Sequence, residues 1–195
     1  MRSLNELTQI LYEISIPMGA NFDIQKMLRN VSLVTLRKLN ATRFVTLELK
    51  KESNHIYYEN IFSSPKSSSK CEDYIEFEHY LPKSSTVEEF DKFRQKLPIA
   101  ISLKSGGGIN VMELPDFGLL VLFRKKGCLQ NEVIQSFLTI TQKLSVACKS
   151  CQLHENLERL VEERTGALEE RNSTLISERN KINNILEGTN AGTWD

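Results

Sequence analysis

The stretch FGLLVLFRKKGCLQNEVIQSFLTITQKLSVACKSCQLHENL, residues 117–157, contains the change of hydrophobic period that decides the fold. Residues 119–123 are apolar at every position, which is typical of a central strand buried on both faces. From Gln130 onward the apolar residues recur at helical spacing, at Val133, Ile134, Phe137, Ile140, Leu144 and Ala147. The stretch therefore predicts a buried strand followed by a helix that packs on the sheet.

Two amphipathic helices are predicted near the start of the chain. In residues 4–15 the leucines and isoleucines recur at helical spacing, and Pro17 and Gly19 end the pattern. A second helix is expected to begin at Asp23, which can act as its N-cap, and to run to about Leu39 with one apolar face.

The middle of the chain predicts strands and one short helix. Alternating or β-rich runs occupy residues 43–52, 55–62, 74–81 and 99–104. In the third run, YIEFEHYL, strict alternation places four side chains on one face, namely Ile75, Phe77, His79 and Leu81. The serine-rich residues 63–70 read as a connection without a site.

The short helix is predicted over residues 85–97, with Ser85 or Thr86 as its cap and Pro98 at its end. Residues 108–126 are typical of a hairpin that turns at Pro115–Asp116. The elements together predict an α+β fold with an antiparallel sheet flanked by helices.

A long helix is predicted at the end of the chain, because nothing breaks the helical pattern between Gln130 and Gly188. At 1.5 Å per residue, such a helix is about 90 Å long. Its later part is charged and carries a thin seam whose steps alternate between four and three, as in a coiled coil. The seam residues are Leu157, Val161, Arg164, Leu168, Arg171, Leu175, Glu178, Ile182 and Ile185.

Composition narrows the possible partners and the compartment. Lys plus Arg and Asp plus Glu both number 25, and this zero net charge argues against a nucleic-acid partner bound by long-range electrostatics. No apolar run approaches the roughly 18 residues that would suggest a membrane span. Four cysteines without a secretory signal indicate reduced thiols and a cytoplasmic protein.

The order of elements resembles a GAF sensor domain, and residues 117–157 look like its last strand and closing helix. LERLVEERTGALEERNSTL, residues 157–175, resembles the signalling helix of bacterial sensor proteins, and ILEGTNAGTWD, residues 185–195, resembles the opening of a PAS domain. The resemblance implies a GAF-like domain over residues 1–152, a coiled-coil helix over 153–186 and the start of a truncated PAS domain over 187–195. In similar proteins a GGDEF diguanylate cyclase or a histidine kinase often follows.

This resemblance implies a non-catalytic, cytoplasmic regulatory module of a bacterial signalling protein. Such a module would form a homodimer through its terminal helices and relay a signal along a parallel coil to downstream PAS and output domains. Two alternatives remain open. One is a pure dimerisation module with a degenerate GAF domain, and the other is a thiol-dependent enzyme similar to the free-methionine sulfoxide reductases.

A ligand pocket, if one exists, is expected between the sheet and the helix near residues 86–97, lined by Phe77, His79, Phe90 and Phe93. The alternative for His79 is a core histidine with a backbone partner. The cofactor is unknown. A cyclic nucleotide is not expected, because the Asn-Lys…Phe-x-x-x-Asp-Glu motif of GAF domains that bind it is missing after residue 123.

Other candidate sites have simpler explanations. Cys148 and Cys151 are spaced like a redox or metal pair, but they lie within a helix and no second Cys/His cluster follows, so no metal site is assigned. The glycines at 106–108 lie between two predicted strands without a following Lys-Ser/Thr, which indicates a hairpin connection and not a phosphate loop.

Overall fold

The computed structural model of the chain describes residues 4–52, 55–66, 71–82 and 87–191. By its internal contacts the chain forms two units, Met1–Gln152 and Leu153–Asp195. The boundaries expected from the sequence, at residues 152 and 186, stay predictions.

A five-stranded antiparallel sheet is the centre of the first unit, in the order β2-β1-β5-β4-β3. Its strands are β1 (Arg43–Glu52), β2 (His55–Ser64), β3 (Ile99–Ser102), β4 (Gly108–Leu114) and β5 (Gly118–Arg124). The apolar run expected to be a central strand is β5, and residues 118–123 are all buried. The predicted hairpin is confirmed, since β4 and β5 pair directly and Asp116 in their turn has a φ of 54°.

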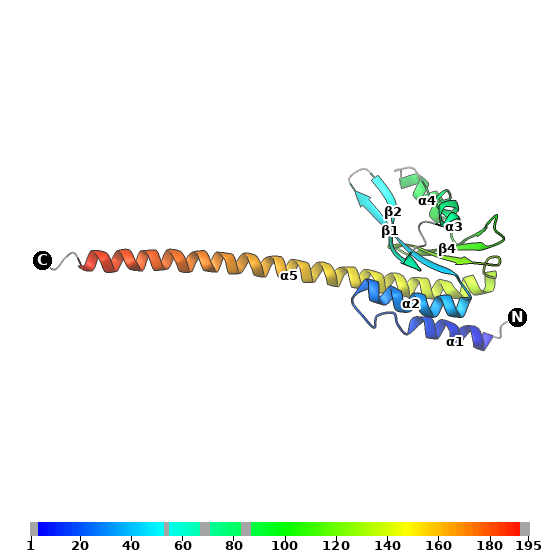
Figure 1. The fold of residues 1–195 in the computed structure, drawn as a ribbon, viewed down its shortest axis with the longest axis horizontal. Helices are drawn as coiled ribbons and strands as arrows, with labels where there is room; N and C mark the ends of the chain where they lie inside the picture. Colours follow the sequence, from blue (N-terminus) through cyan, green and yellow to red (C-terminus); the bar gives the residue numbers. More distant parts are fainter. Residues whose placement is uncertain (1–3, 53–54, 67–70, 83–86, 192–195) are drawn as a thin grey trace. The chain divides into compact units, whose positions relative to one another are not determined.

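One face of the sheet is covered by α2 (Ile24–Leu39) and the first turns of α5 (Asn131–Ala191), and α1 (Leu4–Ser15) packs beside α2 (Figure 1). The α2 helix begins as predicted, because the Asp23 carboxylate accepts a hydrogen bond from the amide of Lys26. The core on this side joins all three helices to the sheet, with side chains such as Leu28, Phe44 and Phe137.

The opposite face is covered by two short helices, α3 (Glu72–Glu78) and α4 (Val87–Arg94) (Figure 1). Alternate residues of the central strands point to this side, as the period of a strand requires. Val121 and Phe123 of β5 therefore share a core with Tyr74 and Phe77 of α3. Ser85 and Thr86, the expected caps of α4, lie outside the described residues.

The predicted strand over residues 74–81 is wrong, because this segment forms α3. Alternation would bury Ile75 together with Phe77, whereas the helix buries Tyr74 and Phe77, three residues apart, and leaves Ile75 47% exposed. The glutamate and aspartate at 72 and 73 favour a helix start.

The long helix expected from the sequence is present as α5, which runs through Ala191. The seam residues over 157–185 are all exposed. The predicted PAS start at 187–195 has a helical backbone up to Ala191, and residues 192–195 lie outside the described part of the chain. Among the described helices, none is both long and apolar enough to cross a bilayer.

Candidate functional site

Of the four residues expected to line a pocket, Phe77 and Phe90 are buried, Phe93 is half-buried and His79 is exposed. Phe77 is fully buried, with its ring centroid 5.9 Å from that of Tyr74 and 6.0 Å from that of Phe123. His79 follows the last residue of α3, is exposed, and has its Nδ1 atom 2.7 Å from the carbonyl oxygen of Ile75. The prediction that His79 lines an interior pocket is therefore wrong, because it depended on the strand that is not formed.

The other two aromatic residues lie on α4 and face the β1–β2 hairpin. The ring of Tyr58 is 5.3 Å from that of Phe90 and 6.3 Å from that of Phe93, measured between centroids. Aromatic rings at these separations contribute stability beyond their buried area. Phe90 and Phe93 therefore hold α4 on the sheet.

Beside these rings lies a cleft of about 370 Å³ at the end of the sheet where the β4–β5 turn is found. Its lining combines apolar and charged residues from β1, β2, α4, β4, the start of β5 and the turn. They are Leu49, Lys51, Tyr58, Arg94, Glu113, Leu114, Asp116, Phe117 and Gly118. A concave site with an apolar wall and a few charged groups is the common form of a small-molecule site.

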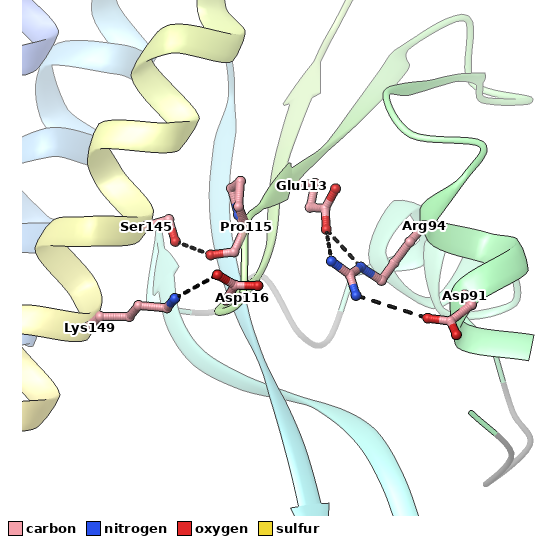
Figure 2. Close-up of polar contacts among 7 residues, drawn as sticks. All are labelled: Asp91, Arg94, Glu113, Pro115, Asp116, Ser145 and Lys149. Atoms are coloured by element: carbon pink, nitrogen blue, oxygen red, sulfur yellow. Dashed lines mark hydrogen bonds and ion pairs between the residues drawn. The ribbon is translucent and has the colours of Figure 1, made fainter. Parts of the chain in front are cut away.

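An ion pair between α4 and β4 forms one wall of the cleft. Arg94 donates a hydrogen bond from Nε to Glu113 Oε1 at 2.7 Å, and its Nη2 atom forms an ion pair with the same oxygen at 2.6 Å (Figure 2). The Nη1 atom of Arg94 lies 4.0 Å from a carboxylate oxygen of Asp91, which is beyond hydrogen-bonding distance. The pair is partly exposed and ties α4 to the strand that leads into the turn.

The turn itself contacts α5 on the other side of the sheet. Ser145 donates its hydroxyl hydrogen to the carbonyl of Pro115, and Lys149 Nζ lies 3.0 Å from Asp116 Oδ2 (Figure 2). The hydrogen bond from Lys149 holds the pKa of Asp116 below its ordinary value. Residues 113–116 thus connect the cleft to α5 through short contacts.

The ionisation of Tyr58 in the cleft makes the unfolding free energy depend on pH. Burial raises the pKa of Tyr58 from 10.0 to about 12. The folded chain holds this proton more tightly than the unfolded chain, so the contribution to stability is complete below pH 10 and is lost as the pH rises through 12. We expect Tyr58→Phe to reduce the fall of unfolding free energy over this range, measured by urea denaturation. Tyr12→Phe, at an exposed position, should show the same fall of unfolding free energy as the wild type. An equal fall in the wild type and in both variants would contradict the prediction.

Two of the four cysteines are buried, and two are partly exposed. Cys148 and Cys151 belong to α5 and are buried in the core on its sheet-facing side, and burial raises the pKa of the Cys148 thiol far above its ordinary value. The Cys128 thiol lies 3.3 Å from the carbonyl oxygen of Ile101. In the described segments, no group of three or more His, Cys, Asp or Glu residues could hold a metal ion.

The arrangement of the sheet and helices is similar to that of GAF domains of known structure. The GAF domain of an Acinetobacter phosphoenolpyruvate-protein phosphotransferase matches with a TM-score of 0.50 and 13% sequence identity, over 80% of this chain and 99% of that chain. The chain has the GAF fold. The phycoerythrobilin-bound GAF domain of a cyanobacterial phytochrome has a TM-score of 0.43 and 11% identity, over 80% of this chain and 98% of that one. No family model and no curated protein matches the sequence.

Within this GAF fold, sequence reasoning missed the charged residues of the cleft. The Pro115–Asp116 turn could be predicted from its composition, but its contacts with α5 could not. Arg94 and Glu113 are 19 residues apart, and neither belongs to a recognisable motif. Their meeting depends on how α4 docks on the sheet, and local sequence carries no signal for that docking.

Proposed function

We propose that this chain is a non-catalytic, cytoplasmic regulatory GAF module of a bacterial signalling protein. A change at the cleft would pass through the β4–β5 turn into α5, and from there along a parallel dimeric coil to downstream PAS and output domains. The output would be a diguanylate cyclase or a histidine kinase. The observation that carries the proposal is the double contact of the turn with α5, through Ser145 and Lys149.

The dimer is supported by the exposed seam of α5. Its six apolar members are each more than half exposed, namely Leu157, Val161, Leu168, Leu175, Ile182 and Ile185. A regular line of exposed apolar side chains marks a surface that another protein covers. A second copy of the same helix in parallel register fits this line, because equivalent residues then meet across the two-fold axis.

The absence of catalysis is proposed from the state of the thiols. A reactive cysteine needs an accessible, electropositive setting that stabilises the thiolate. Cys148 is buried with its pKa raised, which is the opposite environment. Thiol-dependent reduction of a sulfoxide that disappears in Cys128→Ser or Cys71→Ser would overturn this part of the proposal.

A second candidate is a pure dimerisation module with a degenerate GAF domain. It is favoured by the aromatic rings of Tyr74, Phe77 and Phe123, which pack against one another in the interior between α3 and the sheet. The two candidates differ in one respect: a regulatory module couples the turn to the strength of the dimer, and a simple dimerisation module does not.

The relay can be tested with Ser145→Ala, which removes the hydroxyl that bonds the turn. Ser145 is 2% exposed and cannot contact a partner chain directly. We nevertheless expect the dimer dissociation constant to change at least about five-fold, because allosteric coupling energies of 1–3 kcal/mol are typical. Analytical ultracentrifugation measures the dimer dissociation constant.

The matched control is Ser136→Ala, whose hydroxyl donates to the Glu132 carbonyl of its own helix. It should leave the dissociation constant unchanged. If Ser145→Ala behaves like this control while remaining folded, the relay is wrong and the simple dimerisation module is favoured. A wild-type chain that stays monomeric would contradict both candidates.

A further inference from the structure

One charged residue of the cleft beside Tyr58 has no ion-pair partner among the described residues. Arg94 is matched by Glu113, and Asp116 is matched by Lys149 of α5. Lys51 also lines the cleft, and within the described residues it has no ion pair. The cleft therefore offers a free ammonium group and favours a negatively charged ligand.

Arg94 can accept part of such a ligand without giving up Glu113. Its Nε and Nη2 atoms are the ones that face Glu113, and among the described residues Nη1 has only the 4.0 Å contact with Asp91. A guanidinium group has five N–H donors in a planar fork and suits carboxylates geometrically. A ligand carboxylate placed at Nη1 would therefore accept a hydrogen bond from Arg94 while Glu113 keeps its contacts.

The remaining walls of the cleft favour an apolar body on the ligand. Leu49 and Lys51 alternate with Lys50 along β1, so they share one face of the strand. Tyr58 lies directly opposite Leu49 in the β1–β2 register, and Phe117 extends the apolar surface. The volume of about 370 Å³ is at the small end for ligand pockets, which limits the ligand to one ring or a short chain.

We propose that this cleft binds a small organic carboxylate with an apolar body, its carboxylate held by Lys51 and Arg94 and its body against Leu49, Tyr58 and Phe117. This inference rests on the proposed regulatory function, since it names the ligand class of that module. Binding at Arg94 would act on the helix-to-turn ion pair, and the turn leads to Ser145 and Lys149.

The test uses amide NMR titration of the full 195-residue chain with 3-phenylpropionate. Two further probes each lack one feature of this ligand: 3-phenylpropionamide lacks the charge, and inorganic phosphate lacks the apolar body. We expect saturable shifts around the cleft with the carboxylate, binding about ten-fold weaker with the amide, and no saturation with phosphate. Equal binding of acid and amide, or no saturable shifts below about 10 mM acid, would overturn the proposal.

Two lysine variants test whether the Lys51 ammonium group holds the carboxylate of the ligand. Lys51→Met should weaken binding of 3-phenylpropionate about five-fold, as expected for one partly exposed ion pair of up to about 1 kcal/mol. Lys50→Met is the matched control, since the Lys50 ammonium pairs with Glu48 and lies outside the cleft lining. An unchanged affinity in Lys51→Met rejects this site. Dimer dissociation, measured on the same samples without ligand, tests the regulatory function separately.

Discussion

Replacing Arg164 and Arg171 together by leucine should strengthen the dimer by about 4 kcal/mol and raise its melting temperature. Both arginines occupy seam positions where leucine would be buried in every heptad. Their long stems can carry the charge out to solvent, but the apolar contact is lost. The double change adds four leucines per dimer, and each partly buried leucine contributes at least about 1 kcal/mol. Thermal unfolding followed by circular dichroism measures the effect.

Arg159→Leu is the control for this change, because Arg159 lies on the outer face of the same helix. It removes only an exposed ion pair with Glu163, which contributes less than about 0.5 kcal/mol. Equal melting temperatures for the double variant and wild type would show that the seam is wrong. In a longer protein with an output domain, we expect the double change to hold the output in one state, since a coil locked in one register cannot report a change upstream.

Gly118→Ala should unfold the domain or destabilise it by more than about 4 kcal/mol. Gly118 begins β5 and pairs with Glu48 of β1. A Cβ atom at this position would lie 1.9 Å from the carbonyl oxygen of Leu47, so the two central strands would have to separate. Urea denaturation of the variant measures the loss.

Gly166→Ala is the matched control, with an effect of opposite sign. A Cβ atom at Gly166 meets nothing within 4 Å, and alanine favours a helix by about 1 kcal/mol relative to glycine. This variant should therefore be slightly more stable. A Gly118→Ala chain as stable as wild type would contradict the close approach of β1 and β5.

The elements with a clear hydrophobic period could be predicted from the sequence, and most were. The strand β5 lies between two cores, so its burial imposes a continuous apolar run. The helix α2 buries one face, so its apolar residues recur at helical spacing. The apolar pattern of residues 74–81 is compatible with both a helix and a strand. Tyr74, Phe77 and Leu81 fit a helix, while Ile75, Phe77 and Leu81 fit a strand, and only tertiary packing distinguished them.

The cleft could not be predicted because its residues come from five elements and a turn, and they meet only through docking. Lys51 and Tyr58 are brought together by strand register, which the turn of the β1–β2 hairpin sets. Arg94 reaches Glu113 because Phe90 and Phe93 hold α4 beside Tyr58. Charged side chains at such positions look like ordinary surface residues until the packing is known.

The most direct test of a parallel signalling coil is disulfide crosslinking between two chains that carry Leu168→Cys. In a parallel dimer the two copies of residue 168 face each other across the seam, so mild oxidation should link the chains rapidly. Ser173→Cys places the thiol on the outer face and should crosslink no faster than the wild-type chain, whose four cysteines set the background. Efficient crosslinking at 168 and background crosslinking at 173 is the predicted result. Crosslinking at 168 no faster than at 173 would contradict the parallel coil and, with it, the proposed relay.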